Sequence, residues 1–257
     1  MIKVLGDYHT HTIFSSGFKK KGTHATGTIE DNANVALSKG LKTLVISEHG
    51  PGHYLYGVRD KNIPLMKEEI KKLNEYYVPR GLRILLGVEA NLVGIDGVLD
   101  VDERFINQID ILLTGYHYGA MPKSIRDGLG LYVYNPISKV IKINEEKVIE
   151  MNTKAYLKAM DNYKIDIITH PGSKAKINIV EVAKKAKRVG TALEISAKHS
   201  ELSVKSLNLL KDIDVDYYIN SDAHRPEDVG NIEKGILKAK ESKVPFERIK
   251  NIIVEGE

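Results

Sequence analysis

The chain contains no cysteine among its 257 residues. This absence excludes disulfide bonds, thiolate metal ligands and a cysteine nucleophile, so any metal site has to use histidine, aspartate and glutamate. Glutamine is almost as rare, because Gln108 is its single occurrence, whereas lysine and glutamate are plentiful. Such a composition is typical of proteins from heat-adapted organisms.

Long hydrophobic runs and a strong charge of one sign are also missing. No apolar stretch approaches the roughly 18 residues of a membrane span, and the first residues lead into a strand pattern without a basic-then-apolar leader. The formal net charge is only +4, and the basic residues are scattered. We therefore expect a cytoplasmic protein with no membrane partner and no nucleic-acid partner; the oligomeric state stays open.

Strand and helix patterns alternate along the whole chain. Short apolar, β-branched runs predict strands buried on both faces at residues 3–8, 43–47, 83–88, 110–114, 166–169, 191–195 and 216–220. Helical patterns lie between them at residues 29–38, 65–77, 103–108, 145–162, 179–189, 204–211 and 231–242. Thr28 and Gly190 stand where an N-cap and a C-cap are expected. In residues 118–144 we expect neither helix nor strand.

Seven β-then-α units predict an α/β protein with a parallel sheet. An open doubly wound sheet and a closed barrel both satisfy this pattern. No linker or shift in composition divides the chain, so we expect a single domain over residues 1–257. The irregular region 118–144 is long for a compact domain, and a loop of that length is usually functional or mobile.

Six of the seven predicted strands end in histidine, aspartate or glutamate. The C-terminal ends of parallel strands meet on one side of the sheet, where active sites form. We therefore expect these side chains to converge, with His24, in front of the first helix, as a further candidate. The strand-end candidates are His9, His11, His49, Glu89, His117, His170, Asp222 and His224. The sixth strand is the exception, and its Glu194 is predicted to lie outside the site.

A metal site explains this repetition better than hydrogen bonding does. One histidine at a strand end is more often a hydrogen-bonded polar group than a ligand, but this chain uses six of its nine histidines there. Clustered imidazoles repel one another when protonated, and a metal holds them neutral. Nine nitrogen and oxygen ligands suit three ions of zinc, manganese or iron. Glu89 is predicted to bridge two of these ions.

The motifs at the strand ends resemble those of the PHP family, the polymerase and histidinol phosphatase superfamily, over nearly the whole chain. The matching stretches are Asp7-Tyr-His9-Thr-His11-Thr12, Glu48-His49-Gly50-Pro51, Gly87-Val-Glu89-Ala90-Asn91, Gly115-Tyr-His117, Thr169-His170-Pro171-Gly172 and Ser221-Asp222-Ala-His224. The chain looks most like the small stand-alone phosphoesterases of the family. The resemblance implies a distorted seven-stranded (β/α)7 TIM-like barrel with up to three metal ions at its C-terminal end.

The resemblance also implies a distribution of the ligands, position by position. One ion would take His9, His11, Glu89 and His224, a second would take Glu89, His117 and His170, and a third would take His24, His49 and Asp222. Asp7 is expected to orient one of the ligand histidines.

The expected activity is hydrolysis of a small phosphomonoester by a metal-activated hydroxide, with zinc the first choice and manganese or iron possible. No side chain is assigned a separate catalytic role. Arg225, which follows the last ligand, is expected to contact the phosphate of the substrate. His53 is expected to donate a proton to the leaving group or, equally, to cap its loop. His199 is expected to be peripheral.

Three alternatives stay open. Histidinol-phosphate phosphatase belongs to the same superfamily, and no residue distinguishes its alcohol. PHP modules also occur attached to DNA polymerases, but this chain has no polymerase sequence, basic stripe or aromatic stacking platform. Metal-dependent amidohydrolases also begin with His-x-His, but they usually place a lysine at a middle strand end, where Glu89 and His117 stand here.

Overall fold

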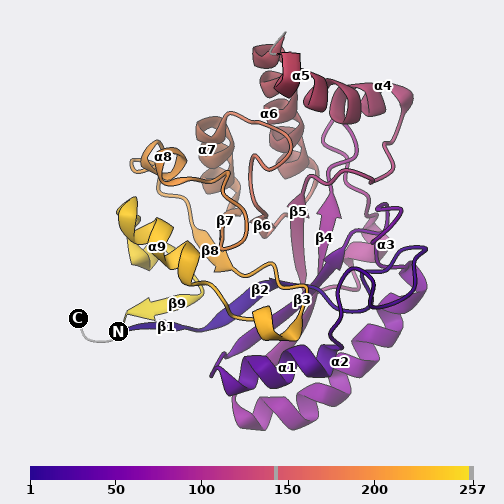
Figure 1. Ribbon diagram of the computed structural model, residues 1–257, viewed down its shortest axis with the longest axis vertical. Coiled ribbons are helices and arrows are strands. Elements are labelled where there is room, and N and C mark those ends of the chain that lie inside the picture. Colours follow the sequence, from indigo (N-terminus) through magenta and orange to yellow (C-terminus); the bar gives the residue numbers. More distant parts are fainter. Residues whose placement is uncertain (142–143, 255–257) are drawn as a thin grey trace.

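A computed structural model describes residues 1–141 and 144–254 of the chain (Figure 1). Seven parallel strands form one sheet and follow one another in chain order. They are β2 (Gly6–Thr10), β3 (Thr43–His49), β4 (Arg83–Asn91), β5 (Ile111–Gly115), β6 (Ile167–Ile168), β7 (Ala192–Ser196) and β8 (Tyr217–Asn220). The predicted α/β class and the parallel sheet are therefore confirmed.

The two outer strands of the sheet, β2 and β8, come together and nearly close it into a barrel. At the C-terminal end, the amide of His11 donates to the carbonyl of Ala223 at 2.8 Å. At the N-terminal end, the side chain of Asn251 donates to the carbonyls of Gly6 at 2.8 Å and Ile219 at 2.6 Å. Of the two sheet types that the sequence allowed, the structure has the distorted (β/α)7 barrel.

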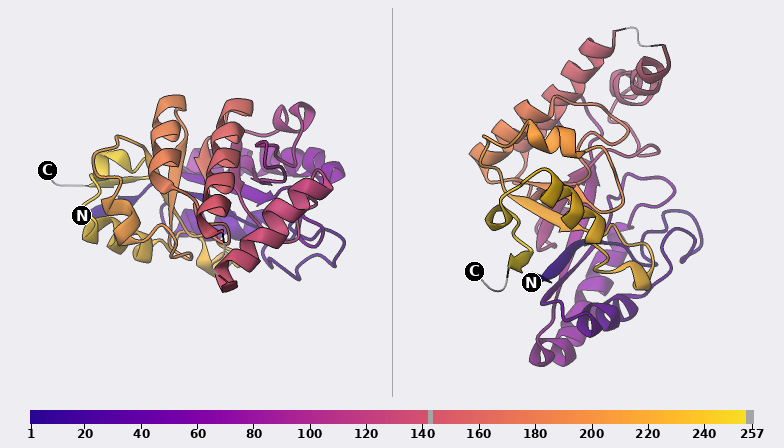
Figure 2. Two further views of the ribbon diagram at one scale, coloured as in Figure 1. Left: turned by 90° about the horizontal axis from the view of Figure 1, so that it is seen from above. Right: turned by 60° about the vertical axis from the view of Figure 1, so that its left-hand side comes forward.

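Helices surround the strands, with α1 and α2 on one side and α6 and α7 on the other (Figures 1 and 2). The helices that match the sequence patterns are α1 (Ile29–Ser38), α2 (Ile63–Tyr77), α3 (Glu103–Ile106), α6 (Glu145–Asn162), α7 (Ile179–Val189), α8 (Val204–Asn208) and α9 (Glu233–Glu241). Short 3-10 turns lie at Asp60–Asn62, Val78–Arg80, Pro226–Asp228 and Phe246–Arg248. Within the described residues, no helix has the length and the hydropathy needed to cross a membrane.

Local sequence signals explain where these helices begin and end. Thr28 and Asp31 form a capping box at the start of α1, because each side chain accepts a hydrogen bond from the other residue's backbone N–H, at 3.0 and 2.9 Å. Ala33 on the same helix is buried against the barrel. Gly190 ends α7 with φ of 78°, a left-handed conformation that glycine adopts without strain. Both predicted caps are confirmed.

The predicted strand over residues 3–8 is two strands in the structure. β1 (Ile2–Val4) leaves the barrel and pairs antiparallel with β9 (Ile252–Val254), which the sequence analysis did not predict. Leu5 lies between β1 and β2, and its amide donates to the carbonyl of Asn251 at 2.8 Å. The chain changes its pairing partner at this residue, and a three-residue apolar run carries too little periodicity to predict that.

The expectation of irregular structure in residues 118–144 is wrong for much of its described part. α4 (Ile125–Asp127), the π-helix η3 (Gly128–Tyr134) and α5 (Asn135–Ile141) follow one another there. Residues 142–143 of that region lie outside the described residues. Gly128 and Gly130 are weak helix formers, and a π-helix does not have the 3.6-residue period, so the usual helix signal is missing. The segment lies at the outer edge of the molecule (Figures 1 and 2).

Candidate active site

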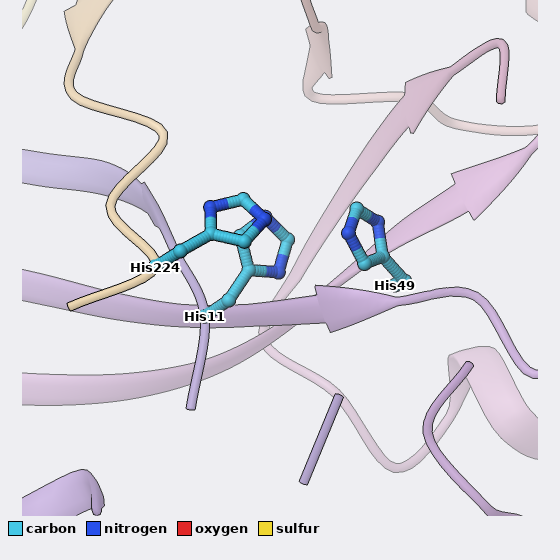
Figure 3. A group of neighbouring side chains, drawn as sticks. All are labelled: His11, His49 and His224. Atoms are coloured by element: carbon cyan, nitrogen blue, oxygen red, sulfur yellow. The ribbon is translucent and has the colours of Figure 1, made fainter. Parts of the chain in front are cut away.

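The candidate ligands meet at the C-terminal end of the barrel. His9 lies on β2, His49 ends β3 and Glu89 lies on β4, while the other strand-end candidates follow their strands directly. Figure 3 shows His11, His49 and His224 approaching one another from three separate segments. The ring centre of His11 lies 4.2 Å from that of His49 and 4.5 Å from that of His224.

Glu89 is fully buried at the centre of this cluster. Its Oε1 lies 2.9 Å from Nε2 of His170 and 3.4 Å from Nε2 of His117. Its Oε2 lies 3.0 Å from Nδ1 of His49 and 3.3 Å from Nε2 of His9. The two oxygens therefore face different pairs of imidazoles, which is the arrangement that a carboxylate bridging two metal ions requires.

The small size of Gly115 leaves room for the carboxylate of Glu89. A Cβ atom at Gly115 would lie 2.9 Å from Oε1 of Glu89 and 2.5 Å from Oγ1 of Thr169. The hydroxyl of Thr169 donates to Oε1 at 2.7 Å and holds the carboxylate in place. A larger residue at position 115 would displace this contact.

The two candidate carboxylates are ionised despite their burial. Burial alone raises the pKa of Glu89, but the imidazoles of His117 and His9 hold that pKa well below its ordinary value. Burial also raises the pKa of Asp222, and the rings of His9 and His11 lower it in the same way. The site therefore offers two negative charges to a cation.

Several buried polar atoms of the cluster lack a hydrogen-bond partner within the described chain. They are His9 Nε2, His11 Nε2, His49 Nδ1, His170 Nδ1 and Glu89 Oε2. Leaving a buried polar atom unpaired costs about 1–3 kcal/mol, so native proteins almost always satisfy such atoms. Imidazole nitrogens and carboxylate oxygens are ligands of divalent transition metals. The residues present therefore fit divalent metal ions.

Asp222 approaches His9, which lies on β2, and His11, which directly follows β2. Its Oδ1 lies 3.4 Å from Nε2 of His11 and 3.7 Å from Nε2 of His9, and the three residues can hold one ion. The resemblance implied His224 in this place. Asp222 adopts φ of 53°, so the chain turns sharply after β8, and the carboxylate of Asp222 faces β2.

His24 joins His49 and His224. Its Nε2 lies 2.9 Å from Nε2 of His49 and 3.0 Å from Nε2 of His224. The implied distribution placed Asp222 with His24 and His49, and His224 with His11; in the structure His224 approaches both His24 and His11. The loop in front of α1 brings His24 into the cluster, as its position in the sequence suggested. Burial, followed by the neighbouring His49, lowers the pKa of His24 to about 2, so its ring is neutral near pH 7.

Glu194 is part of the site, and the prediction that it lies outside is wrong. Its Oε1 lies 2.8 Å from Nδ1 of His9, and its Oε2 accepts from the backbone N–H of His170 at 2.8 Å. A hydrogen bond from Nδ1 to a carboxylate leaves Nε2 of His9 free to bind metal. The error arose because Glu194 lies inside β7 rather than at its end, although its side chain points into the barrel and is fully buried.

Replacing Glu194 by glutamine is expected to weaken metal binding by about 10- to 100-fold, the usual effect of losing a partner that orients a ligand. Glutamine has only one acceptor oxygen, whereas His9 and His170 each use a different oxygen of Glu194. Titration against a chelating dye measures the affinity, and circular dichroism checks the fold. Glu241→Gln, an exposed position at the end of α9, is the control. Equal affinity in both variants would contradict the role given to Glu194.

Asn91 and Asp100 orient His117. The Oδ1 of Asn91 lies 2.9 Å from Nδ1 of His117, which leaves Nε2 of that ring facing Glu89. The backbone N–H of Asn91 donates to Oδ1 of Asp100 at 2.7 Å. Burial raises the pKa of Asp100 to about 6, although its hydrogen bonds with Asn91 oppose the shift.

Asp7 has a different role from the expected one. Its carboxylate accepts hydrogen bonds from Oγ of Ser221 at 2.5 Å, from the amide of Ser221 at 3.2 Å and from the amide of Gly230 at 2.8 Å. No imidazole of the described residues is hydrogen-bonded to the Asp7 carboxylate. Asp7 thus ties β2 to the segment after β8 and fixes the backbone beside Asp222.

Lys198 and His199, in the loop after β7, also reach the site. The Nζ of Lys198 lies 3.3 Å from Oδ2 of Asp222 and 3.1 Å from Nδ1 of His224. Nε2 of His199 lies 3.1 Å from the same oxygen of Asp222, and its ring centre lies 4.6 Å from that of His170. His199 therefore lies in the site, whereas a structural or peripheral position was expected for it. Its position directly after a barrel strand was the signal that could have identified it.

The two predicted substrate contacts lie in different surroundings. His53 is buried, its Nδ1 accepts from the amide of Tyr56 at 3.1 Å, and its ring hydrogen-bonds the backbone of Tyr118. Burial and the neighbouring His49 lower the pKa of His53 to about 4. A neutral ring held by backbone groups favours the loop-capping role over proton donation. Arg225 is exposed at the edge of the site.

Two cavities adjoin the cluster. The smaller, about 250 Å³, is lined by candidate ligands together with Lys174, Lys198 and His199. The larger, about 730 Å³, shares Lys198 with it and is lined by Arg225 among other charged side chains. The cluster is thus open to a small anionic ligand from one side and continues into a polar space on the other.

Known proteins similar to this chain are named probable phosphatases. A protein from Shewanella piezotolerans named "Probable phosphatase" is 30% identical over 264 residues, which cover 97% of this chain and 90% of that protein. A probable phosphatase from Caldanaerobacter subterraneus subsp. tengcongensis is 29% identical over 267 residues, covering 99% of this chain and 89% of that protein. No family model matches the chain.

A solved structure shares the fold. Histidinol phosphate phosphatase from Lactococcus lactis, crystallised with zinc, L-histidinol and phosphate, superposes with a TM-score of 0.63 at 19% identity, covering 93% of each chain. Together with the barrel, the converging motifs and the similarity in sequence to phosphatases, this establishes the family. The chain belongs to the PHP (polymerase and histidinol phosphatase) family and is a phosphatase, a hydrolase of phosphoric esters, with a site for divalent metal.

Proposed function

We propose that the protein hydrolyses a small phosphomonoester at a site that holds three divalent transition-metal ions, with zinc as the first choice. The observation that carries this proposal is the position of Glu89, whose two oxygens face His117 and His170 on one side and His9 and His49 on the other. A carboxylate placed in this way joins two ions. The ligand set is completed by His11, His24, Asp222 and His224.

We divide the proposed ligands into three groups, and the distances between the residues support this division. The first is His9, His11 and Asp222 with Glu89, the second is Glu89, His117 and His170, and the third is His24, His49 and His224. Bound there, divalent ions would polarise phosphoryl oxygens and lower the pKa of a bound water towards 7.

Side chains around the proposed ligands fix the orientation of the imidazole rings and the charge of the site. His9 and His117 point Nδ1 at Glu194 and Asn91, so the Nε2 lone pairs face the centre of the site. Nδ1 of His224 lies 3.0 Å from the backbone carbonyl of Asp222, which orients that ring in the same way. The site is thereby preorganised before substrate binds.

The substrate contacts that we propose are cationic. Lys174 and Lys198 line the smaller cavity beside the ligands, where ammonium groups can pair with phosphoryl oxygens that face away from the metals. The larger cavity continues past Lys198 to Arg225 and would receive the alcohol part of the substrate. Its volume of about 730 Å³ and charged lining suit a polar alcohol rather than an apolar aryl group.

Histidinol phosphate is a second candidate substrate. The larger cavity is lined by Asp228 and Glu233 as well as by Arg225 and Lys234. The two carboxylates could pair with the amine of an amino alcohol, and the structurally similar Lactococcus lactis enzyme was crystallised with L-histidinol and phosphate.

A phosphatase screen tests the proposed function. Metal-free protein is reconstituted with zinc, manganese or iron in turn and offered phosphorylated metabolites, including histidinol phosphate, nucleotides and an aryl phosphate. We expect release of phosphate from at least one small monoester with metal and none without it. Failure of every monoester with every metal, together with hydrolysis of single-stranded DNA, would instead indicate a nucleic-acid-processing PHP module.

A further inference from the structure

The segment α4–η3–α5 lies at the edge of the molecule (Figures 1 and 2). Most of its apolar side chains are exposed to solvent. Its most exposed members are Ile125, at 86%, and Val140, at 83%. The exposed apolar residues of the segment and its approach are Met121, Ile125, Leu129, Val133, Tyr134, Ile137 and Val140. A continuous apolar patch of this kind marks an interaction site rather than ordinary surface.

The opposite side of the segment, which packs on the protein, carries several polar contacts beside the buried Leu131. Asp127 accepts from the amide of Ile95 at 2.8 Å. Asn135 and Asn152, on α6, exchange two side-chain hydrogen bonds, at 2.7 and 3.1 Å. An ordinary surface helix turns its apolar stripe to the core and its polar side to water. This segment instead buries Asp127 and Asn135 beside Leu131 and leaves most of its apolar side chains exposed for a partner.

The apolar residues lie on one continuous face. Ile125, Leu129, Val133 and Ile137 recur every four residues. In a regular α-helix that spacing drifts by about 40° at each step, because a turn takes 3.6 residues. The π-helix Gly128–Tyr134 has wider turns, which offset this drift and keep the four side chains in line.

We propose that this face binds a second copy of the same chain, with the two segments antiparallel about a two-fold axis. The exposed fractions of the seven apolar residues correspond to on the order of 700 Å² in each chain, close to the roughly 800 Å² per partner of a standard interface. Dimers of two-fold symmetry are the commonest soluble assemblies, and they use one patch twice.

The charges at the two ends of the segment fit this pairing. Arg126 lies at the start, and Glu146 lies just beyond the end, in the first turn of α6. Both residues are exposed, and neither forms an ion pair within the described part of the chain. An antiparallel arrangement places Arg126 of each copy against Glu146 of the other.

The segment also touches the wall of the active site. Leu131 packs with Tyr116, whose hydroxyl donates to the Leu131 carbonyl, and Tyr116 directly precedes His117. Pairing of two copies therefore stabilises the end of β5, which is followed by the candidate metal ligand His117.

Sedimentation equilibrium of the full chain tests the proposal. We expect a mass of twice 28.7 kDa at micromolar concentration. The double variant Leu129→Glu, Ile137→Glu is expected to sediment as a monomer with an unchanged circular dichroism spectrum. The control is Leu65→Glu, on α2, where the leucine is 62% exposed; it is expected to stay dimeric.

A charge exchange checks the antiparallel arrangement. Arg126→Glu alone is expected to weaken the dimer at least ~10-fold, and addition of Glu146→Arg is expected to restore it, as for other close charge pairs across interfaces. A monomeric unaltered protein would overturn the proposal, and so would a double variant Leu129→Glu, Ile137→Glu that stays dimeric. Monomers that bind phosphatidylserine vesicles through the segment would show that a membrane, not a second copy, covers the face.

Discussion

Replacing Glu89 by glutamine is expected to remove metal from the site and to lower phosphatase turnover at least ~100-fold, about 2.7 kcal/mol of transition-state stabilisation. Glutamine keeps the size of the side chain but loses its charge and one acceptor oxygen. The NH2 group of the glutamine would replace the oxygen that faces either His117 and His170 or His9 and His49. Two ions that share this residue would then repel each other with less negative charge between them.

Elemental analysis and phosphatase assays on the same preparation check this expectation. The matched control is Glu103→Gln on α3, where the glutamate is exposed. This variant is expected to keep full metal content and activity. The buried Glu194 is unsuitable as a control because its carboxylate contacts His9. The full metal complement with near-normal turnover in the Glu89 variant would show that no bridging carboxylate is needed here.

Removal of metal by chelation is expected to abolish phosphatase activity while the barrel stays folded. The hydrophobic core extends between the strands and the surrounding helices, so the fold has its own source of stability. Buried donor atoms such as Nε2 of His11 and Oε2 of Glu89 lack a hydrogen-bond partner within the described chain, so they are left unpaired when the metal leaves. The melting temperature is therefore expected to fall on chelation and to rise again when zinc, manganese or iron is restored.

Circular dichroism, thermal melts and phosphate-release assays before and after chelation give the three readouts. Activity that survives thorough chelation would contradict a metal-dependent reaction. Loss of the helical and strand signals on chelation would show instead that the metal holds the fold together, as it does in small zinc-dependent domains.

Periodicity and strand-end chemistry predicted most of the fold and of the site. Parallel strands place their C-terminal ends on one side, so residues as distant as His9 and His224 could be expected to meet without any knowledge of their contacts. Capping residues such as Thr28 located helix boundaries, because they satisfy backbone groups locally. These features depend on short-range rules that a sequence displays directly.

The remaining features depend on contacts that a sequence does not display. Glu194 lies inside a strand, and only the inward direction of its side chain brings it to His9. The approach of Asp222 to His11 depends on the left-handed conformation at Asp222. The helical segment after β5 exposes an apolar face and contains the π-helix Gly128–Tyr134. Neither feature follows the ordinary helical pattern.

The number of metal ions per chain tests the central claim most directly. Elemental analysis of protein saturated with zinc, after removal of free metal, is predicted to give three ions per chain, with more than one retained under stringent washing. The expectation rests on the three proposed ligand groups, of which the first and the second share Glu89. Saturation at a single ion, or no bound metal at all, would contradict the trinuclear site.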